Sequence, residues 1–137
     1  MDTNCLFCKM VTGEIPVEKV WEDESFMAIV DIKPINLGHL LLIPKTHSNN
    51  LLDMPEEALT KVGHHLQNLA KAVKDATQAD GINIGMNNEA AAGQLIMHAH
   101  FHIIPRFKGD GFEHWHGKEV AVEDLKDIRQ KISSLIK

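Results

Sequence analysis

At 137 residues the chain is long enough for one buried core and too short for two ordinary domains. It is 44% hydrophobic and 24% charged, which is typical of a globular protein, and its net charge of -5 argues against a general nucleic-acid binder. A small anionic ligand is not excluded, because it needs only a few hydrogen-bond donors in one pocket.

The amino-terminal segment has no basic stretch followed by an apolar one, and no apolar run approaches the ~18–20 residues of a membrane span. We therefore expect a cytoplasmic protein with no membrane or nucleic-acid partner. Cys5 and Cys8, the two cysteines, lie three residues apart. In a reducing compartment such a pair is more often a metal or redox pair than a disulfide.

The first elements expected along the chain are strands. Residues 17–30 alternate loosely around an acidic turn and predict a hairpin. The turn-rich segment 31–38 leads into the apolar run 39–43, a predicted buried strand that Pro44 ends.

A helix follows, for which Asp53 and Glu56 have the spacing of a capping box and Pro55 suits the first turn. The segment Asp80-Gly81 marks its exit. Five apolar residues recur at helical spacing and predict one buried stripe: Leu59, Val62, Leu66, Leu69 and Val73.

The second half of the chain predicts two further strands and a last helix. The strands are expected over residues 82–86 and 95–104, with a polar loop over 87–94 between them, and the helix over 122–136. These elements predict an α+β fold with a five-stranded antiparallel sheet, one long helix and a C-terminal helix. We expect a core domain over residues 5–107 and a tail with its helix over 108–137.

Three histidines alternate along the predicted fifth strand. His98, His100 and His102 should project from one face, while the apolar residues between them pack against a helix from the other. Three such imidazoles suit either a catalytic zinc ion or a nucleophilic histidine with supporting neighbours. The preceding loop, with Asn87, Gly93 and neutral amide donors, suits phosphate oxygens better than a closed metal site.

The segment from His98 to Ile104 resembles the His-φ-His-φ-His-φ-φ signature of the histidine-triad (HIT) family, in which φ is apolar. The loop from Asn87 to Gln94 resembles that family's phosphate loop, and residues 31–32 and 38–45 resemble its nucleoside-binding strands. The resemblance implies a HIT-like fold that binds a purine nucleotide. It also implies a homodimer in which two sheets join into one.

The resemblance assigns a role to each site residue. His100 would be the catalytic nucleophile, with His102 at the phosphate and His39 in the hydrogen-bond network around the triad. The implied nucleotide-binding residues are Asp31 at the ribose, Ile32 at the base, and Asn87, Gly93, Gln94, His100 and His102 at the phosphate. Leu95 departs from the pattern, because many members have Ser or Thr there to assist the leaving group. Either Leu95 simply faces the core, or another donor protonates the leaving group in its place.

A zinc-binding, bacterial-type branch of the family is similar to this chain in its two cysteines. The similarity implies a structural zinc ion held by Cys5, Cys8, His47 and His98. Spacing alone leaves open that the two thiols bind nothing. Two other features stay ambiguous: Arg106 suits either an additional phosphate or a solvated strand end, and the segment 114–116 either binds a ligand or is an exposed tail.

The leading hypothesis is a nucleotidyl hydrolase that cleaves a purine nucleotide at its α-phosphate through a nucleotidyl-histidine intermediate. The substrate would be a nucleoside phosphoramidate or a dinucleoside polyphosphate. The alternatives are a nucleotide-binding regulatory module with little turnover, which Leu95 favours, and a three-histidine zinc hydrolase, which would leave Cys5 and Cys8 without a role.

Overall fold

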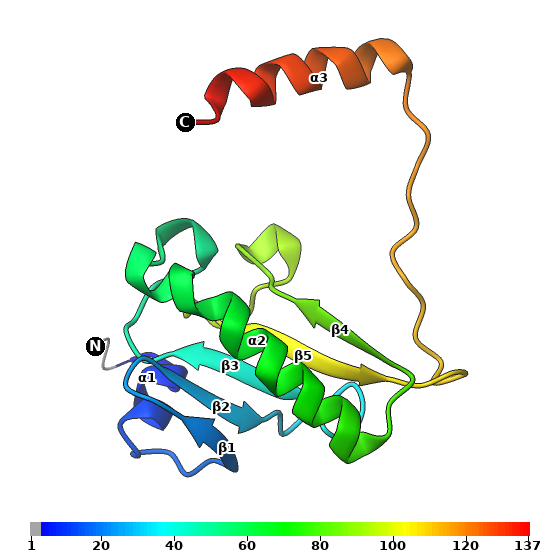
Figure 1. Cartoon of the computed structure of the whole chain (residues 1–137). Coiled ribbons are helices and arrows are strands. Elements are labelled where there is room, and N and C mark those ends of the chain that lie inside the picture. Colours follow the sequence, from blue (N-terminus) through cyan, green and yellow to red (C-terminus); the bar gives the residue numbers. More distant parts are fainter. Residues whose placement is uncertain (1–3) are drawn as a thin grey trace.

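The structure is a computed structural model that describes residues 4–137, and it has the predicted α+β architecture. One antiparallel sheet has the strand order β1-β2-β3-β5-β4 (Figure 1). Its strands are β1 (Lys19–Glu22), β2 (Phe26–Val30), β3 (Leu40–Pro44), β4 (Gly81–Gly85) and β5 (Phe101–Arg106). The helices are α1 (Leu6–Val11), α2 (Glu56–Thr77) and α3 (Val122–Leu135), with short 3-10 turns η1 (Leu51–Asp53) and η2 (Ala90–Ala92).

The long helix α2 covers one face of the sheet (Figure 1). Val62, Leu69 and Val73 of the predicted stripe are buried there against Phe101 and Ile103 of β5. Each buried side chain of this size contributes roughly 1.5–3 kcal/mol through the hydrophobic effect. The α2 face is therefore the main core of the protein.

The opposite face of the sheet carries a smaller apolar cluster under α1. Met27 and Ile29 of β2 point there, because alternate residues of a strand point to opposite faces. They pack with Phe7 of α1, which is 2% exposed. A buried strand pair thus carries α1 on the side away from α2.

The predicted cap of α2 is wrong. Asp53 instead completes a capping box at the start of η1, where its carboxylate accepts the backbone N–H of Asn50 at 2.9 Å and the Asn50 side chain accepts that of Leu52 at 3.0 Å. Because that carboxylate is already engaged, α2 begins after Pro55 with no side-chain cap. At its other end the helix stops at Gln78, which adopts a left-handed conformation before the expected Asp80-Gly81 exit.

Strand β5 begins and ends later than the sequence predicts. It includes Pro105, and the segment before Phe101 is irregular although it was expected to be strand. The backbone N–H of His98 turns back to the carbonyl of Ile96, and that of Ala99 donates to Ser48 outside the sheet. Met97, expected to pack against the helix, is therefore 45% exposed.

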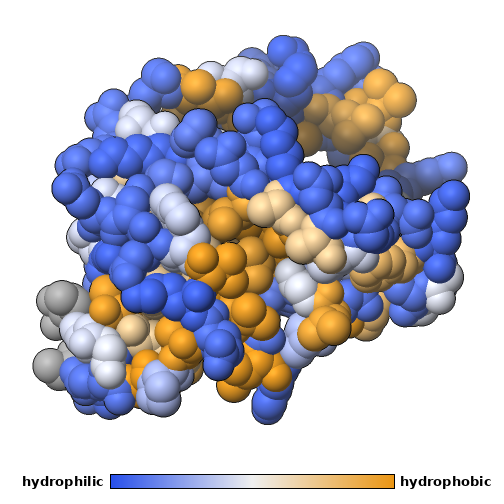
Figure 2. All heavy atoms as spheres, turned by 60° about the horizontal axis from the view of Figure 1, so that its bottom comes forward, coloured by the Kyte–Doolittle hydropathy of each residue, from blue (hydrophilic) through white to orange (hydrophobic). Residues whose placement is uncertain are grey.

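Residues 111–137, named here the C-terminal arm, stand away from the sheet (Figure 1). An extended segment leads to α3, and every residue of the arm is exposed. The C-terminal helix expected over residues 122–136 is present as α3, but it does not cover the sheet. Figure 2 shows that apolar side chains also reach the surface in patches on the body of the molecule. Within residues 4–137, no helix is long and apolar enough to cross a membrane.

Candidate functional site

A cleft of about 710 Å³ opens beside the end of β4 and the neighbouring part of β5. It gathers four residues that the sequence predicts for the site, Asp31, His39, Asn87 and His102. Their neighbours in the lining include the apolar side chains of Ile35, Ile84 and Met86, and Trp115 of the C-terminal arm. The cleft thus combines an apolar part with a few polar groups, which is the usual composition of a small-molecule site.

His100 lies next to this cleft and is 8% exposed. Its ring centroid is 5.1 Å from that of His102. Its Nδ1 donates a hydrogen bond to the backbone carbonyl of His98 at 2.7 Å. Because a neutral imidazole carries one proton, this bond places the proton on Nδ1 and leaves the lone pair on Nε2. That lone pair makes His100 Nε2 a potential nucleophile.

His39 and His102 form a hydrogen-bonded pair of imidazoles. The backbone N–H of Ile35 donates to His39 Nδ1 at 3.2 Å, so the proton of the His39 ring is on Nε2. His39 Nε2 then donates to His102 Nδ1, 2.9 Å away, which places the proton of His102 on its own Nε2. Asp31 Oδ2 lies 3.7 Å from His39 Nε2. The pair therefore presents an N–H donor, His102 Nε2, next to the cleft.

Burial keeps these three imidazoles neutral near pH 7. Burial and the neighbouring imidazoles of His100 and His39 lower the pKa of His102 to about 4. Burial also lowers the pKa of His39, against the opposing effect of the Asp31 carboxylate. The pKa of His100 is lowered for the same reason, although its bond to the His98 carbonyl opposes the shift. A neutral His100 keeps its lone pair available for attack.

The predicted phosphate loop is held by hydrogen bonds of the Gln94 side chain. The Gln94 side chain accepts the backbone N–H of Glu89 at 2.7 Å and donates to the carbonyls of Asn49 at 2.6 Å and Ile96 at 3.0 Å. Gly93 has a φ of +91°, and a Cβ there would lie 3.3 Å from the Asn87 amide nitrogen. Gln94 thus shapes the loop from inside, and Gly93 is needed for both its φ and its close contact.

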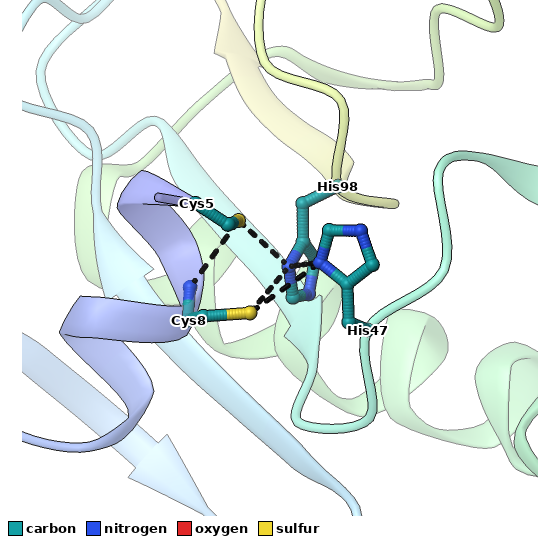
Figure 3. Close-up of side chains that lie close together, drawn as sticks. All are labelled: Cys5, Cys8, His47 and His98. Atoms are coloured by element: carbon teal, nitrogen blue, oxygen red, sulfur yellow. Dashed lines mark hydrogen bonds between the residues drawn. The ribbon is translucent and has the colours of Figure 1, made fainter. Parts of the chain in front are cut away.

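A second group of side chains meets on the other side of His98. Cys5 and Cys8 lie at the start of α1, His47 in the loop after β3, and His98 just before β5 (Figure 3). Cys5 Sγ is 3.3 Å from His98 Nδ1, and Cys8 Sγ is 3.4 Å from His47 Nδ1 and 3.6 Å from His98 Nδ1. The two Nδ1 atoms are 3.2 Å apart. We call these four residues the thiol–imidazole cluster.

This cluster fits a zinc ion. A tetrahedral site with ordinary Zn–S and Zn–N bonds needs ligand atoms roughly 3.3 Å apart for two nitrogens and roughly 3.6 Å for nitrogen and sulfur. The observed separations match these values. The His98 ring also donates from Nε2 to the Pro44 carbonyl at 2.8 Å, so its Nδ1 lone pair points among the other ligands. The donor set and its geometry are thus those of a closed structural site.

The cleft lining includes Arg106 but leaves out four predicted nucleotide-binding residues, Ile32, Gly93, Gln94 and His100. Ile32 is 86% exposed and is not in contact with the cleft. Leu95 is 92% exposed, so it does not face the core. Arg106 binds both oxygens of Asp110 at 2.7 and 3.0 Å, and it also donates to Asn83 and to the Phe112 carbonyl. Its guanidinium therefore fixes the turn that begins the arm.

Two neighbours of the site were not predicted. Phe7 packs edge-on against the rings of His98 and His100, with centroids 5.8 and 5.0 Å away. The sequence signal for it is an apolar residue between two cysteines that must turn their side chains to one point. Trp115 lines the cleft although it is 97% exposed, and the ambiguous segment 114–116 gave no more than a hint of that position.

The family model of the HIT domain matches residues 12–109. The chain belongs to the HIT family. The matched range includes the triad and every cleft residue except those of the C-terminal arm. Cys5, Cys8 and the C-terminal arm lie outside that range.

Similar proteins extend the match beyond the domain. The chain is 42% identical to "Protein hit" of Bacillus subtilis over 134 residues, which are 95% of this chain and 92% of that protein. It is 39% identical to the adenylylsulfatase HINT3 of Arabidopsis thaliana over 99% of this chain and 68% of the relative. Its identity to the adenosine 5′-monophosphoramidase hnt1 of Schizosaccharomyces pombe is 35%, over 98% and 99% of the two chains.

Solved structures agree with the fold. The SMU.412c structure from Streptococcus mutans superposes with a TM-score of 0.94 at 40% identity, over 100% of this chain and 88% of that one. A zinc-bound histidine-triad protein from Mycobacterium smegmatis superposes with a TM-score of 0.76 at 36% identity, over 96% and 95% of the chains. The relatives named adenylylsulfatase and adenosine 5′-monophosphoramidase thus align with almost the whole of this chain.

Proposed function

We propose that the protein is a nucleotidyl hydrolase in which His100 Nε2 attacks the α-phosphorus of a purine nucleotide. The hydrogen bond from His100 Nδ1 to the His98 carbonyl carries the proposal, because a proton on Nδ1 leaves the lone pair on Nε2, and the His100 ring adjoins His102 of the cleft. The substrate would be a nucleoside phosphoramidate or a dinucleoside polyphosphate. The relatives named adenylylsulfatase and adenosine 5′-monophosphoramidase support an adenylyl group joined to a variable leaving group.

The reaction divides into two displacements. In the first, the bond from His100 Nε2 to phosphorus forms while the bond to the leaving group breaks, and the leaving group departs with a proton. In the second, a water oxygen bonds to phosphorus, loses a proton, and releases the mononucleotide from His100. The His98 carbonyl stabilises the imidazolium that forms in the first step, because it accepts the Nδ1 proton.

The protein supplies hydrogen-bond donors for the phosphoryl oxygens. His102 is the first of them, since His39 keeps the proton of His102 on Nε2. The backbone N–H groups of Leu95 and Ile96 are the second, because they have no acceptor among residues 4–137. Fixed donors of this kind stabilise charge that develops in the transition state. The Gln94 side chain acts indirectly, by holding the loop that carries these amides.

Nucleoside recognition is assigned to the apolar part of the cleft. Asp31 Oδ1 accepts the backbone N–H of Lys33 at 2.9 Å, which leaves Oδ2 as the acceptor for ribose hydroxyls. Ile35, Ile84 and Met86 line the cleft and are suited to pack on a purine base. Ile32, which the family resemblance suggests for this role, is turned away in the structure of this chain.

Zinc is the metal that suits the thiol–imidazole cluster, with Cys5, Cys8, His47 and His98 as its ligands. Four protein ligands leave no position for water, so its contribution when bound would be to join α1 to the segment before β5. Zinc-bound thiolates are compatible with the reducing cytoplasm. The zinc-bound mycobacterial relative supports this assignment.

The nucleophile is tested with His100→Asn and with His64→Asn, a control on the exposed side of α2. Turnover of adenosine phosphoramidate and of a dinucleoside polyphosphate should fall by at least about a thousandfold in His100→Asn, while AMP binding changes little. Radiolabelled adenylyl-protein should be trapped in wild type and in the control. Retained turnover within about tenfold in His100→Asn contradicts the proposal.

One observation favours a second candidate, a binding module with little turnover. Leu95 stands at the position where the resemblance places a hydroxyl, and it points to solvent. If that hydroxyl is essential, the protein should bind AMP and form no adduct. The same trapping experiment therefore separates the two candidates.

The C-terminal arm supports a homodimer. In this proposal residues 5–107 are the catalytic domain and residues 108–137 reach to a second copy. A helix of this length is marginally stable alone in water, and α3 has no packing partner within residues 4–137. Its apolar side chains form an exposed stripe of Val122, Leu125, Ile128, Ile132 and Leu135.

A second copy is the occupant that the structure favours. The arm is about a fifth of the chain, so the TM-score of 0.94 over the whole chain requires a similarly projecting arm in the streptococcal structure. The body exposes apolar residues that the arm does not cover, among them Leu52. In a dimer with two-fold symmetry, the apolar stripe of α3 in each copy would pack on the exposed apolar residues of the other copy's body. Strand β4, an edge strand of the sheet, would then lie at the partner subunit.

The dimer is tested by measuring mass in solution. Wild type should sediment as a dimer, and Leu125→Glu with Ile132→Glu should shift it towards monomer by at least about tenfold in Kd. Lys131→Glu on the same helix is the matched control and should stay dimeric. A monomeric wild type, or a double variant that dimerises unchanged, contradicts this use of the arm.

A further inference from the structure

We propose that Phe7 is a positioning residue for His100, and that the thiol–imidazole cluster acts on the nucleophile through it. The inference rests on the proposed role of His100 as the nucleophile. Phe7 lies between Cys5 and Cys8 in the sequence and is 2% exposed. Its ring is tilted by 64° to that of His100, with 5.0 Å between the centroids. An aromatic edge that meets a ring face in this way favours one orientation of both rings.

The His100 imidazole is held on three sides. The His98 carbonyl binds its Nδ1, Phe7 packs against one side, and the ring of His102 lies 5.1 Å away at 65°. One hydrogen bond fixes a single point of the ring, so the two ring contacts decide where Nε2 points. Without Phe7, the imidazole has room to turn away from the His98 carbonyl. The proton is then no longer held on Nδ1, and the lone pair on Nε2 is lost in part of the molecules.

The position of Phe7 depends in turn on the cluster. Helix α1 has 6 residues, too few to be stable without tertiary contacts. Cys5 caps it by accepting the backbone N–H of Cys8 at 3.4 Å, and both thiols converge on His98. Phe7 also meets the His98 ring, at 5.8 Å and 87°. Ligation of the cysteines therefore fixes the turn of helix that presents Phe7 to the nucleophile.

The contact between Phe7 and His100 gives a role to helix α1, which lies outside the range matched by the HIT family model. The family match begins at residue 12, after α1. Phe7 does not reach the cleft, since it is absent from its lining. A change at Phe7 should therefore alter the rate of the covalent step and leave nucleotide affinity unchanged.

The kinetic test compares Phe7→Leu with Phe26→Leu, which removes an equally buried ring from the α2 face. Phe7→Leu should lower kcat and the rate of adduct formation by about tenfold to a hundredfold, the size of a misaligned nucleophile. KM, AMP affinity and zinc content should stay within about threefold, and Phe26→Leu should keep kcat within the same range. A change in KM with kcat unchanged in Phe7→Leu overturns the proposal. An equal fall of kcat in both variants also overturns it.

A spectroscopic test does not depend on turnover. Long-range ¹H–¹⁵N spectra report which ring nitrogen of His100 carries the proton. The wild type should contain the Nδ1–H form alone, whereas Phe7→Leu and the Cys5→Ser, Cys8→Ser double variant should contain both forms. A single Nδ1–H form in Phe7→Leu overturns the proposal. If the wild type hydrolyses no nucleotide, the proposed function fails, and this spectrum still decides the role of Phe7.

Phe7→Met is the second variant if Phe7→Leu does not fold, because methionine fills a similar volume with a flexible chain. It removes the ring edge and retains the apolar packing under α1. Thermal unfolding shows whether the fold is intact. The same mixture of protonated forms is expected in Phe7→Met, and a spectrum identical to wild type overturns the proposal.

Discussion

Two clusters of imidazoles lie on either side of His100, and they differ in where their protons are. In the thiol–imidazole cluster, the Pro44 carbonyl binds the outer nitrogen of His98, so lone pairs meet at the centre. The carboxylate–imidazole cluster consists of Asp31, His39 and His102, whose ligand atoms are also close enough for a metal ion. There the backbone N–H of Ile35 occupies the outer nitrogen of His39, so a proton lies at the centre.

In both clusters, the hydrogen bond to the outer nitrogen of a histidine decides what its inner nitrogen does. An acceptor outside the cluster leaves a lone pair inside, which suits a metal ion. A donor outside leaves an N–H inside, which disfavours a metal ion and donates a hydrogen bond to the next ring. By this criterion His98 presents a lone pair to the thiol–imidazole cluster, whereas His39 presents an N–H to His102.

The largest effect expected from this comparison concerns metal content. Replacing both Cys5 and Cys8 by Ser should reduce zinc from one ion per chain to none, and elemental analysis measures this. The melting temperature should fall by roughly 10 °C, because zinc binding to the folded state contributes to folding free energy. Turnover should fall only partly, since His100 is expected to keep its bond to the His98 carbonyl in part of the molecules.

The matched control for metal content is Asp31→Asn combined with His39→Leu. Because the carboxylate–imidazole cluster has a proton at its centre, this variant should keep one zinc ion per chain. Two zinc ions in wild type, or a loss of zinc in the control, would show that the comparison of the two clusters is wrong.

Much of this arrangement was predictable because it depends on residue types at fixed spacing. The helical stripe with Val62, Leu69 and Val73 predicts α2, and the alternation of His98, His100 and His102 predicts their proximity. What failed depends on competition for local partners. Asp53 has the spacing of a cap for α2, but its carboxylate accepts the backbone N–H of Asn50 instead. The sequence pattern does not show which of these two hydrogen bonds forms.

The proton positions were also beyond prediction from the sequence. They depend on the backbone groups of Ile35 and Pro44, whose side chains carry no signal for a hydrogen bond. Gln94 illustrates the same limit, since its amide suits a phosphate equally well but is used by Asn49 and Ile96. The exposed position of Leu95 follows from that loop and not from its apolar side chain.

An intermediate effect is expected at His39. His39→Leu leaves His102 Nδ1 without its donor, so the proton of His102 is no longer held on the nitrogen nearer the cleft. We expect kcat to fall by about tenfold to a hundredfold, as for other partners that orient a functional histidine, with zinc content unchanged. His39→Asn should recover part of the loss because its amide can donate. An unchanged kcat in His39→Leu would remove the carboxylate–imidazole cluster from catalysis.

The smallest effect concerns the pH dependence of stability. The pKa of His102 is about 4 in the folded chain and about 6.5 when unfolded, because burial and the neighbouring imidazoles disfavour its charged form. The unfolded state therefore binds the proton first as the pH falls. The stability associated with neutral His102 is complete above pH ~6.5 and decreases as the pH falls towards ~4.

His102→Asn should therefore lose less stability than wild type between pH 7 and 4.5. For a half-buried ring, the difference should be about 1–2 kcal/mol after allowance for solvent screening. Urea titrations at both pH values measure it, and the thiol–imidazole cluster contributes equally to both proteins because its ligands are unchanged. Parallel losses in the two proteins would mean that His102 is already protonated in the folded state. A protonated His102 could not accept the His39 N–H, so the proton order assigned to the carboxylate–imidazole cluster would be wrong.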